Sequence, residues 1–467
     1  ELNNSSARQF VWMPAWLPPN VIQRKTGGLA DVAHSLPNAL TALQVDVRVV
    51  LPAYRQVLAA VDSIRVLGWL QVSGGREVRI LEVAHPEVTA PLWLVDEAQL
   101  FDRSECPYTN ASGQDWQDNP LRFAVFSEAA ALLACDGLGL GWRADTAHAN
   151  DWQTGLVAAY LSQSASPPHT VFTVHNLAYD CQIDFGTFQA LGLPDHWWSM
   201  DHGEFYGRLS MLKSGMVFSE LITTVSPRYA EEIRTTEYGY GYASVLEGFA
   251  DKLVGVLNGI DDRTWDPKTD PLLAANYHVN GKIRSAKRAN RRALLAAMDA
   301  SPMALEQDGP LVGFIGRLVY QKGIDLLLEV IPELLTQSDV QFAIIGSGER
   351  ELEQRLIDLT HRYPNRVFCH LGYSEQLAHQ LEAGCAERQA ARRDRAQPPG
   401  RVGGRLVRRI RAAHPLSPSA PRGHALDHLG PPPRGMADLV RPHSKGRLGG
   451  SRARMARAAP ARSLWIP

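Results

Sequence analysis

The sequence predicts an α/β protein with two Rossmann-like domains, and two observations support this fold class. Short apolar and β-branched runs alternate with helical runs over most of the chain, which is typical of a mostly parallel, doubly wound sheet. A polar stretch and a basic helix interrupt this alternation once, which indicates two domains. In chain order we expect an irregular N-terminal segment (1–24), a first Rossmann-like domain (25–261), a linker with a connecting helix (262–309), an incomplete second Rossmann-like domain (310–385) and an Arg- and Pro-rich disordered tail (386–467).

The composition limits the class of protein. The chain has 467 residues, 45% of them hydrophobic, which is enough for two or three domain cores. Its five cysteines are widely spaced and form no Cys-x-x-Cys pair, so we expect neither a disulfide framework nor a zinc site. We find no apolar run of membrane-spanning length and no signal-peptide pattern. A net charge of −1 favours neither a nucleic-acid nor a membrane partner, and we expect a cytoplasmic protein.

The first domain is predicted from one helix at 29–43, another at 123–134 and a series of strands. Polar residues stand where three of these strands end, namely Asp151, His175 and Ser226. In a doubly wound sheet, ligands bind at the carboxyl ends of the strands. We therefore expect a site built from these polar residues. The expected strands lie at 45–51, 78–83, 92–95, 146–149, 170–174, 221–225 and 253–257.

Residues 1–24 give no convincing strand ahead of the first helix. Pro14, Pro18 and Pro19 each lack the backbone N–H that a residue in a central strand donates. A glycine-rich loop in an α/β fold should directly follow a buried strand. Either the first strand is short and displaced, or this segment is not the natural lead-in to the loop.

The run Lys25-Thr26-Gly27-Gly28-Leu29-Ala30-Asp31 has the features of a phosphate cradle at the start of a helix. Adjacent glycines let the backbone approach an anion closely, and the helix N-terminus directs its amides and the positive end of its dipole at that anion. Lys25 adds a full positive charge, so the segment outlines a diphosphate site. On these residues alone, a Gly-Gly turn before an ordinary surface helix explains the pattern equally well.

The second domain repeats the strand-helix pattern but ends early. Arg317 follows its first strand directly, and Lys322 lies in the loop that leads to the next helix. We expect strands at 310–316, 341–345 and 367–371, and helices at 324–335, up to about 362, and at 376–383. After about three strands, the α/β pattern stops.

The tail after residue 385 differs from everything before it. It carries a net charge of about +14 against about −15 for the rest of the chain, and its prolines are scattered. Such a segment cannot bury enough apolar surface to offset its ordering entropy. A nucleic-acid-binding arm and a plain disordered tail are both alternatives. We favour a GC-rich coding sequence read in the wrong frame, because the change in composition falls in the middle of a domain.

Eight motifs, in their order and spacing, resemble the bacterial glycogen (starch) synthase family over residues 25–385. No single motif is decisive, but the combination is specific. The motifs are Lys25–Asp31, Asp151-Trp152-Gln153, His175-Asn176-Leu177, Thr224-Val225-Ser226-Pro227, Asn258-Gly259-Ile260-Asp261, Gly316-Arg317-Leu318, Gln321-Lys322-Gly323 and Gly372-Tyr373-Ser374.

The resemblance implies the GT-B architecture, in which two Rossmann-like domains face a cleft. It implies transfer of glucose from ADP-glucose to the non-reducing end of an α-1,4-glucan such as glycogen, with retention of configuration. It implies no cofactor and no metal, because arginine and lysine stabilise the diphosphate leaving group. Arg317 and Lys322 match the pair that clamps the phosphates, and Lys25, Gly27 and Gly28 would approach the same diphosphate from the first domain.

The resemblance also assigns the polar residues of the first domain. His175 would hold the glucose ring and help to stabilise an oxocarbenium-like centre, although taken alone it reads as a structural histidine. Asp151 would lie on the acceptor side, or would cap a helix over 154–161. Tyr108 would lie near the donor sugar, and Tyr373 near the adenine or at the edge of a core. Further substrate-binding roles fall on Asp31, Asn176 and Asn258.

The chain departs from the family after Cys385. The family continues there with a Glu-Pro-x-Gly-Leu segment whose glutamate holds hydroxyls of the donor sugar, and this segment is absent. We therefore expect a parent glycogen synthase and impaired activity in this chain. The alternatives are a GT-B transferase that uses UDP-glucose and an inactive remnant that binds glucan.

Overall fold

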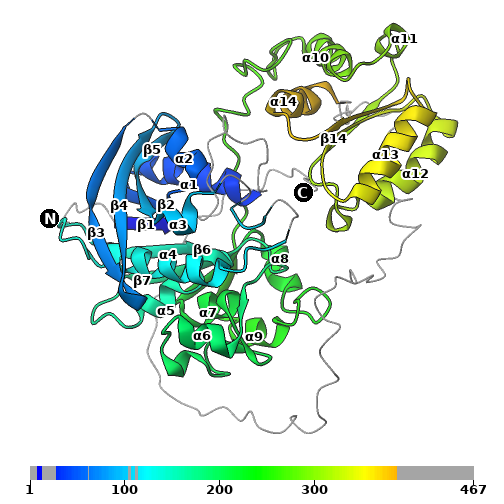
Figure 1. The fold of residues 1–467 in the computed structure, drawn as a ribbon. Coiled ribbons are helices and arrows are strands. Elements are labelled where there is room, and N and C mark those ends of the chain that lie inside the picture. Colours follow the sequence, from blue (N-terminus) through cyan, green and yellow to red (C-terminus); the bar gives the residue numbers. More distant parts are fainter. Residues whose placement is uncertain (1–7, 13–27, 62, 104–106, 111–113, 386–467) are drawn as a thin grey trace, which may run out of the picture. The chain divides into compact units, whose positions relative to one another are not determined.

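The computed structural model describes residues 8–12, 28–61, 63–103, 107–110 and 114–385 (Figure 1). The chain forms two compact units, one made of Glu1–Ala286 with Gly372–His379 and the other of Lys287–Leu371 with Gln380–Pro467. The structure thus groups residues 372–379 with the first unit, whereas the sequence pattern placed them in the second domain. No helix within the described ranges is both long and apolar enough to cross a membrane.

The first unit is built on a nine-stranded sheet of order β12-β11-β7-β6-β1-β2-β5-β4-β3. Every neighbouring pair from β12 to β5 is parallel, and β4 and β3 add an antiparallel edge. The strands are β1 (Arg8–Trp12), β2 (Asp46–Pro52), β3 (Ile64–Val72), β4 (Arg76–His85), β5 (Val88–Asp96), β6 (Thr146–Asn150), β7 (His169–Val174), β11 (Leu221–Thr224) and β12 (Leu253–Gly255).

Strand β1 corrects the expectation that residues 1–24 are irregular. It lies at the centre of the sheet, where it pairs in parallel with β2 on one side and β6 on the other. The strand is only five residues long and ends at Trp12, before the first of the three prolines. The alternative of a short, displaced strand therefore holds. The prolines themselves, with Lys25 and Gly27, lie outside the described residues.

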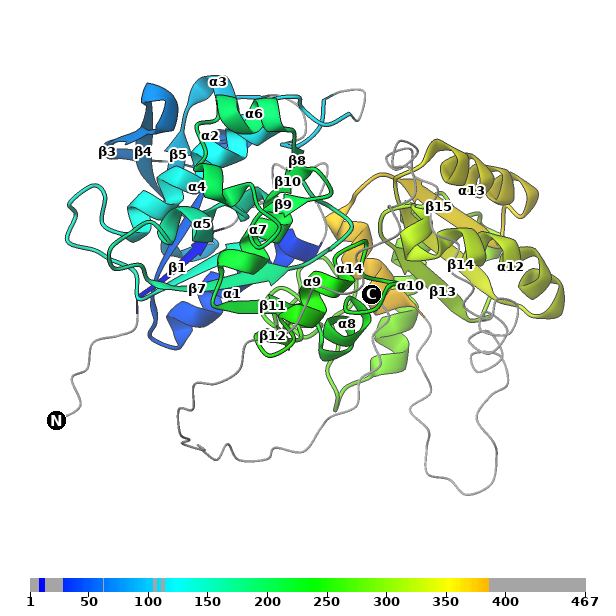
Figure 2. The ribbon, with the colours of Figure 1, turned by 90° about the horizontal axis from the view of Figure 1, so that it is seen from below.

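Helices cover both faces of this sheet. The connection from β1 to β2 runs in one direction across the sheet, and those from β5 to β6 and β6 to β7 run in the other. Right-handed crossovers therefore place α1 on one face and α4, α5 and α7 on the opposite face, as Figure 2 shows. The helices are α1 (Gly28–Ala42), α2 (Arg55–Ala59), α3 (Ala98–Phe101), α4 (Asn119–Ala134), α5 (Val157–Leu161), α6 (Phe185–Ala190), α7 (Met211–Phe218), α8 (Pro227–Glu232) and α9 (Ala243–Gly248).

A small antiparallel sheet accompanies the main one in the first unit. Its three short strands pair in the order β8-β10-β9. They are β8 (Gln182–Ile183), β9 (Glu204–Phe205) and β10 (Arg208–Ser210). Strand β10 leads directly into α7, whose first turn is capped by the Ser210 side chain. The sequence patterns indicated neither this sheet nor the edge strand β3.

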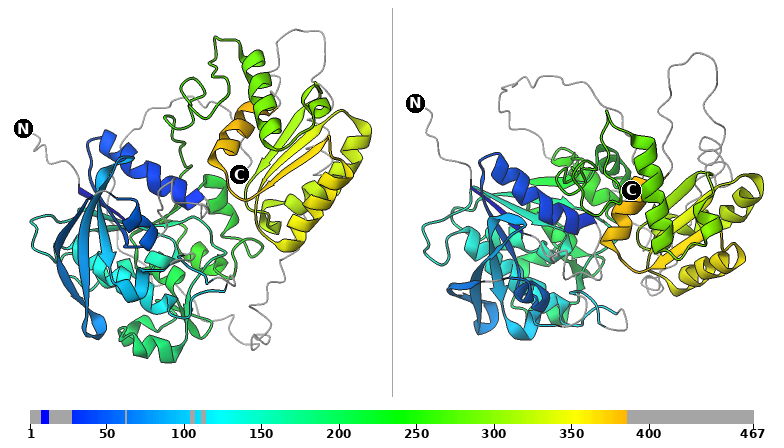
Figure 3. Two further views of the ribbon diagram at one scale, coloured as in Figure 1. Left: turned by 45° about the horizontal axis from the view of Figure 1, so that its top comes forward. Right: turned by 90° about the horizontal axis from the view of Figure 1, so that it is seen from above.

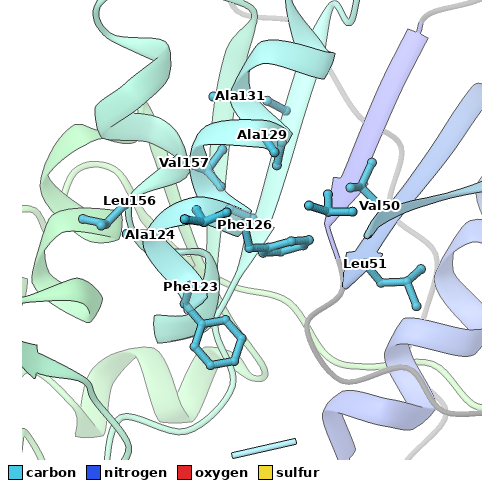
Figure 4. Close-up of a cluster of buried hydrophobic side chains, with 14 of the residues drawn as sticks. Val50, Leu51, Phe123, Ala124, Phe126, Ala129, Ala131, Leu156 and Val157 are labelled. Atoms are coloured by element: carbon cyan, nitrogen blue, oxygen red, sulfur yellow. The ribbon is translucent and has the colours of Figure 1, made fainter. Parts of the chain in front are cut away.

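The core of the first unit is centred on α4. Phe123, Phe126 and Ala129 are fully buried on this helix, and Val50 and Leu51 of β2 are fully buried in the sheet. Figure 4 shows the Phe126 ring directed from α4 toward these strand residues. The other side of α4 packs on α5. Since helix faces toward both the sheet and α5 must be apolar, α4 is hydrophobic over most of its circumference.

The described part of the second unit has a three-stranded parallel sheet of order β13-β14-β15. The strands are β13 (Leu311–Ile315), β14 (Gln341–Gly346) and β15 (Val367–Leu371). The helices that pack around it are α10 (Ile283–Ala297), α11 (Pro302–Leu305), α12 (Ile324–Gln337), α13 (Arg350–Arg362) and α14 (Glu375–Gly384). Figure 3 shows α12 and α13 on one face of this sheet and α10 on the other.

Candidate functional site

The polar residues expected to form a site lie along the carboxyl edge of the first sheet. Strand β6 ends at Asn150 and is followed by Asp151, while β7 ends at Val174 and is followed by His175. These two strands are neighbours, and β6 also adjoins β1, where the strand order reverses. Ligands in such sheets bind outside the carboxyl ends of the strands at this reversal.

Asp151 is used to hold the loop after β7. Its Oδ1 accepts the backbone N–H of His175 at 2.7 Å, and its carboxylate also accepts from the backbone of Asn176. Burial outweighs both hydrogen bonds and raises the pKa of Asp151 to about 7. The backbone adopts φ 55°, a strained value for a residue other than glycine. The carboxylate caps no helix, since the 3₁₀ turn Trp152–Thr154 takes no side-chain hydrogen bond from it.

His175 has one nitrogen engaged and one left open. Its Nε2 lies 2.9 Å from Asn150 Oδ1. Its Nδ1 is buried and has no hydrogen-bond partner among the residues that the structure describes. Burial, with a smaller contribution from nearby His148, lowers the pKa of His175 to about 3. The imidazole is therefore neutral at physiological pH, and its open nitrogen lies at the edge where a ligand is expected.

The loop over residues 175–178 is fixed from several sides. Asn176 Oδ1 accepts the backbone N–H of Ala178 at 3.1 Å. The backbone N–H of Leu177 donates to the Tyr229 hydroxyl at 3.1 Å, and Tyr229 is itself placed by the Ser226 cap of α8. Tyr229 was not among the predicted site residues, because nothing in the sequence marks a tyrosine inside a short helix as a loop anchor.

A chain of hydrogen bonds runs beneath the site between neighbouring strands. His148 Nε2 lies 2.6 Å from Thr173 Oγ1, which lies 2.6 Å from Thr223 Oγ1. Burial lowers the pKa of His148 to about 4, so this second imidazole is also neutral. The chain links β6, β7 and β11 close to their carboxyl ends and stiffens the edge that carries Asp151 and His175.

Tyr108 packs beside this edge through Trp152, the residue after Asp151. The two ring centroids lie 6.0 Å apart, and Phe123 stacks edge-on against Trp152 at 4.9 Å. The Tyr108 ring is half-buried. Asn119 donates to the backbone carbonyl of Tyr108 at 3.0 Å and fixes its position. The structure thus groups Asp151, His175, Asn176 and Tyr108 around one end of the sheet.

Arg317 and Lys322 lie together on the loop after β13 in the second unit, and both are exposed. The loop after β14 packs closely against it, since Leu318 and Gly348 form a parallel bridge. A Cβ on Gly346 would lie 1.9 Å from the Gly316 carbonyl oxygen, and one on Gly348 would lie 2.1 Å from that of Leu318. Only glycine fits at these two positions, so they fix the backbone that carries the two cations.

The remaining predicted residues lie on other elements or outside the described residues. Gly28 is the first residue of α1, and Asp31 falls in its first turn. Asn258 is exposed beyond the end of β12, and Tyr373 follows β15. Lys25 and Gly27 are not within the described ranges. In those ranges, no group of three or more His, Cys, Asp or Glu side chains is arranged to hold a metal ion.

Comparison with known proteins places this geometry in a family. A model of the starch synthase catalytic domain matches residues 18–248, and a model of glycosyl transferases group 1 matches residues 309–384. The glycogen synthase of Hydrogenovibrio crunogenus is 46% identical over 366 residues, which cover 77% of this chain and 74% of that protein. The chain belongs to the glycogen synthase family. It is therefore a member of a glucosyltransferase family.

Further relatives agree with this assignment. The glycogen synthase of Cellvibrio japonicus is also 46% identical, over 363 residues that cover 77% of this chain and 74% of that protein. Among solved structures, the catalytic domain of starch synthase IV from Arabidopsis thaliana, bound to ADP and acarbose, aligns with a TM-score of 0.70. It is 29% identical, and the alignment covers 82% of this chain and 77% of that chain. The α/β fold with parallel sheets is thus close to that of a GT-B starch synthase.

Proposed function

We propose that the chain is a glycogen synthase that transfers glucose from ADP-glucose to the non-reducing end of an α-1,4-glucan, with retention of configuration, in the cytoplasm. One observation carries the proposal: this member of the glycogen synthase family has a neutral, half-buried histidine, whose buried Nδ1 is open, at the carboxyl edge of its first sheet. Such a group suits an uncharged, hydroxyl-rich sugar, which is bound through hydrogen bonds.

In this proposal His175 binds the transferred glucose. The transition state of glucosyl transfer has oxocarbenium character, so positive charge develops on the sugar. The low pKa of His175 keeps a second positive charge away from that centre. Asp151 shapes the acceptor side of the same edge through the loop that it holds. Tyr108 and Asn176 then border the sugar.

The diphosphate of the donor is assigned to Arg317 and Lys322. Both side chains are exposed, as groups that must reach a dianionic ligand have to be. Charge-assisted hydrogen bonds from arginine and lysine stabilise the departing nucleoside diphosphate. Lys25, Gly27 and Gly28, with Asp31 in the first turn of α1, form the second predicted phosphate-binding segment. Tyr373 and Asn258 complete the proposed donor contacts.

We further propose that transfer by this chain is impaired. The match to the group 1 glycosyltransferase model ends at residue 384. The sequence beyond it lacks the glutamate-containing segment that the family uses to hold the donor sugar. Losing one such preorganised contact lowers catalysis by about 10²- to 10³-fold. The first unit has a nine-stranded sheet, so binding of the glucan acceptor is expected to persist.

The test is incorporation of glucose from ADP-[¹⁴C]glucose into glycogen by the purified chain. We expect slow but measurable transfer, at least about 100-fold below that of the Hydrogenovibrio crunogenus relative. Equal turnover by the two proteins would contradict the impairment. Faster incorporation from UDP-glucose than from ADP-glucose would contradict the proposed donor. Retarded migration in glycogen-containing gels without any transfer would instead support the glucan-binding remnant.

A further inference from the structure

Two consecutive residues at the end of β6 hold the same histidine in different ways. Asp151 accepts the backbone N–H of His175 at 2.7 Å, and Asn150 Oδ1 contacts its ring Nε2 at 2.9 Å. The main chain and the imidazole of His175 are thus fixed from one dipeptide. The function assigned above uses Asp151 and His175 but gives no task to Asn150.

Asn150 itself is rigidly placed. Its side chain is fully buried. Its backbone pairs with Thr173 in the sheet, and its carbonyl oxygen accepts the Thr154 hydroxyl at 2.8 Å. A fully buried side chain on a paired strand has little freedom to move, so the position of Asn150 sets that of the His175 ring.

The chemistry of this contact selects one tautomer of the imidazole. A carbonyl oxygen accepts hydrogen bonds and cannot donate them, so the nitrogen facing Asn150 Oδ1 must carry the proton. The neutral ring then has its proton on Nε2, which leaves Nδ1 as a bare acceptor. Nδ1 is the atom that is buried without a partner among the described residues. A buried acceptor of this kind is costly unless a ligand satisfies it.

We propose that Asn150 is a positioning residue that fixes His175 as the Nε2–H tautomer and so presents Nδ1 as a hydrogen-bond acceptor for a hydroxyl group of the bound sugar. The sugar part of this inference rests on the proposed function, while the tautomer part stands on the free protein. The same acceptor discriminates by chemistry: a hydroxyl donates to it, and a carboxylate or phosphate oxygen cannot.

Charged and titratable neighbours support the neutral ring. His148 lies on β6 two residues before Asn150, and its own pKa is lowered to about 4 by burial. The Asp151 carboxylate contacts the backbone of His175 and not its ring. Tyr229 contributes its hydroxyl to Leu177, and burial raises its pKa. The contact with Asn150 is therefore the one that sets which ring nitrogen is protonated.

The first experiment reads the tautomer directly. The full chain is labelled with ¹⁵N-histidine, and NMR spectra correlate each imidazole nitrogen with the protons bound to the carbons of the same ring. A His175→Gln variant identifies the signals of this ring. We expect one nitrogen with the shift of a protonated, pyrrole-type atom at Nε2 and one with the shift of a bare, pyridine-type atom at Nδ1. If the wild-type chain shows the proton of His175 on Nδ1, or an even mixture of the two tautomers, the proposal is overturned, and no Asn150 variant is needed to decide it.

Two substitutions then test the role of Asn150. Asn150→Leu removes the acceptor, and we expect the ring to populate both tautomers. Asn150→Asp keeps an acceptor in place, so the Nε2–H tautomer should persist while the added negative charge raises the pKa of His175. Asn290→Leu removes another fully buried asparagine, on α10, and should leave the His175 signals unchanged. Retention of the single Nε2–H tautomer in Asn150→Leu shows that Asn150 does not set it.

Titration of the same labelled chain tests the sugar part. ADP-glucose and maltohexaose are added separately, and we expect at least one of them to move the Nδ1 signal in the direction of an accepted hydrogen bond. In Asn150→Leu the affinity for that probe should fall by the fraction of rings that remain in the Nε2–H form, about twofold for an even mixture of tautomers. No movement of Nδ1 with either probe overturns the sugar part. If a sugar shifts the Nδ1 signal but no glucose is incorporated into glycogen, this inference stands and the transferase activity is refuted. If glucose is incorporated but His175 has the opposite tautomer, the transferase activity stands and this inference is refuted.

Discussion

The two sheets present very different carboxyl edges. In the first unit, Asp151 and His175 are buried or half-buried, tied to each other and to Asn150, and held by the strands beneath them. In the second unit, Arg317 and Lys322 are exposed on a loop whose shape is set by glycines. One edge keeps its polar groups partly or fully out of water, and the other displays full positive charge.

This difference matches the ligands assigned to each edge. An uncharged sugar is recognised by rigid donors and acceptors in a site with little water, where each hydrogen bond is strong. A diphosphate carries its own negative charge, so cations on an exposed loop can attract it by charge. It follows that substitutions at the first edge should alter stability and its pH dependence. Substitutions of the second edge's cations should alter binding, while changes to the backbone beneath them should alter stability.

The largest effect is expected from Gly348→Ala in the second unit. The added Cβ would lie 2.1 Å from the Leu318 carbonyl oxygen, which is part of the backbone and cannot rotate away. The loops after β13 and β14 would have to separate and lose the bridge between Leu318 and Gly348. We expect a loss of about 3 kcal/mol in the free energy of unfolding of this unit. Hydrogen exchange of β13 and β14 amides in increasing urea measures it.

Gly248→Ala serves as the control for this substitution. Gly248 is the last residue of α9, and a methyl group added there meets nothing within 4 Å. The protection of backbone amides from hydrogen exchange should therefore change little. If Gly348→Ala retained full amide protection in β13 and β14, the close packing of the two loops would not be what holds Arg317 in place.

The next effect concerns the pH dependence contributed by Asp151. Its pKa is about 7 in the folded chain and near 3.8 in an unfolded one, so the folded state holds the extra proton between these values. Stability from this group is therefore fully present below pH 3.8 and is lost as the pH rises through 7. Asp151→Asn removes this loss. Relative to wild type, the variant should gain on the order of 2 kcal/mol between pH 4 and pH 8.

Urea unfolding at several pH values, followed through first-unit amides, measures this difference. Asp136→Asn is a suitable control, because its carboxylate accepts backbone N–H groups of a loop but is only partly buried. Parallel pH curves for wild type and Asp151→Asn would mean that the buried carboxylate does not titrate in this range.

Some elements of the two edges could be predicted from the sequence and others could not. The strands β6, β7, β11 and β13 and the polar residues at their ends were predicted, because a parallel sheet brings strand ends together whatever its details. The position of β1 was not predicted, because the strand is only five residues long and is followed by three prolines, which argue against a central strand. Strand β3 was also missed, because an exposed edge strand alternates less clearly between apolar and polar residues.

The partners of each site residue were harder to predict. The sequence suggested Asp151 as a helix cap, but its strained φ of 55° turns the carboxylate toward the His175 loop. No role was predicted for Asn150, because its role depends on a contact with the imidazole of His175, which lies 25 positions later in the chain. Tyr229 anchors Leu177 across 52 positions. Contacts of this range depend on the register between strands, which residue patterns do not specify.

A smaller effect is expected from Thr173→Val beneath the first edge. The change keeps the shape of the side chain but removes the hydroxyl between His148 and Thr223. A buried imidazole nitrogen then loses its partner, and we expect about 1 kcal/mol of destabilisation in the first unit. Thr336→Val on α12, where the hydroxyl is exposed and donates to the Glu333 carbonyl of the same helix, should cost less. An equal loss in both variants would show that the chain of hydrogen bonds does not stiffen this edge.

The smallest change in stability is expected at the cations of the second edge. Arg317→Ala and Lys322→Ala replace exposed side chains, so the free energy of unfolding should stay within about 0.5 kcal/mol of wild type. Their affinity for ADP, measured by calorimetry, should nevertheless fall on the order of tenfold each, because a charge-assisted hydrogen bond is lost. Arg362→Ala, an equally exposed arginine at the far end of α13, should change neither quantity. Marked destabilisation by Arg317→Ala with unaltered ADP binding would reverse the contrast, because the second edge would then use its charge to hold the fold and not the ligand.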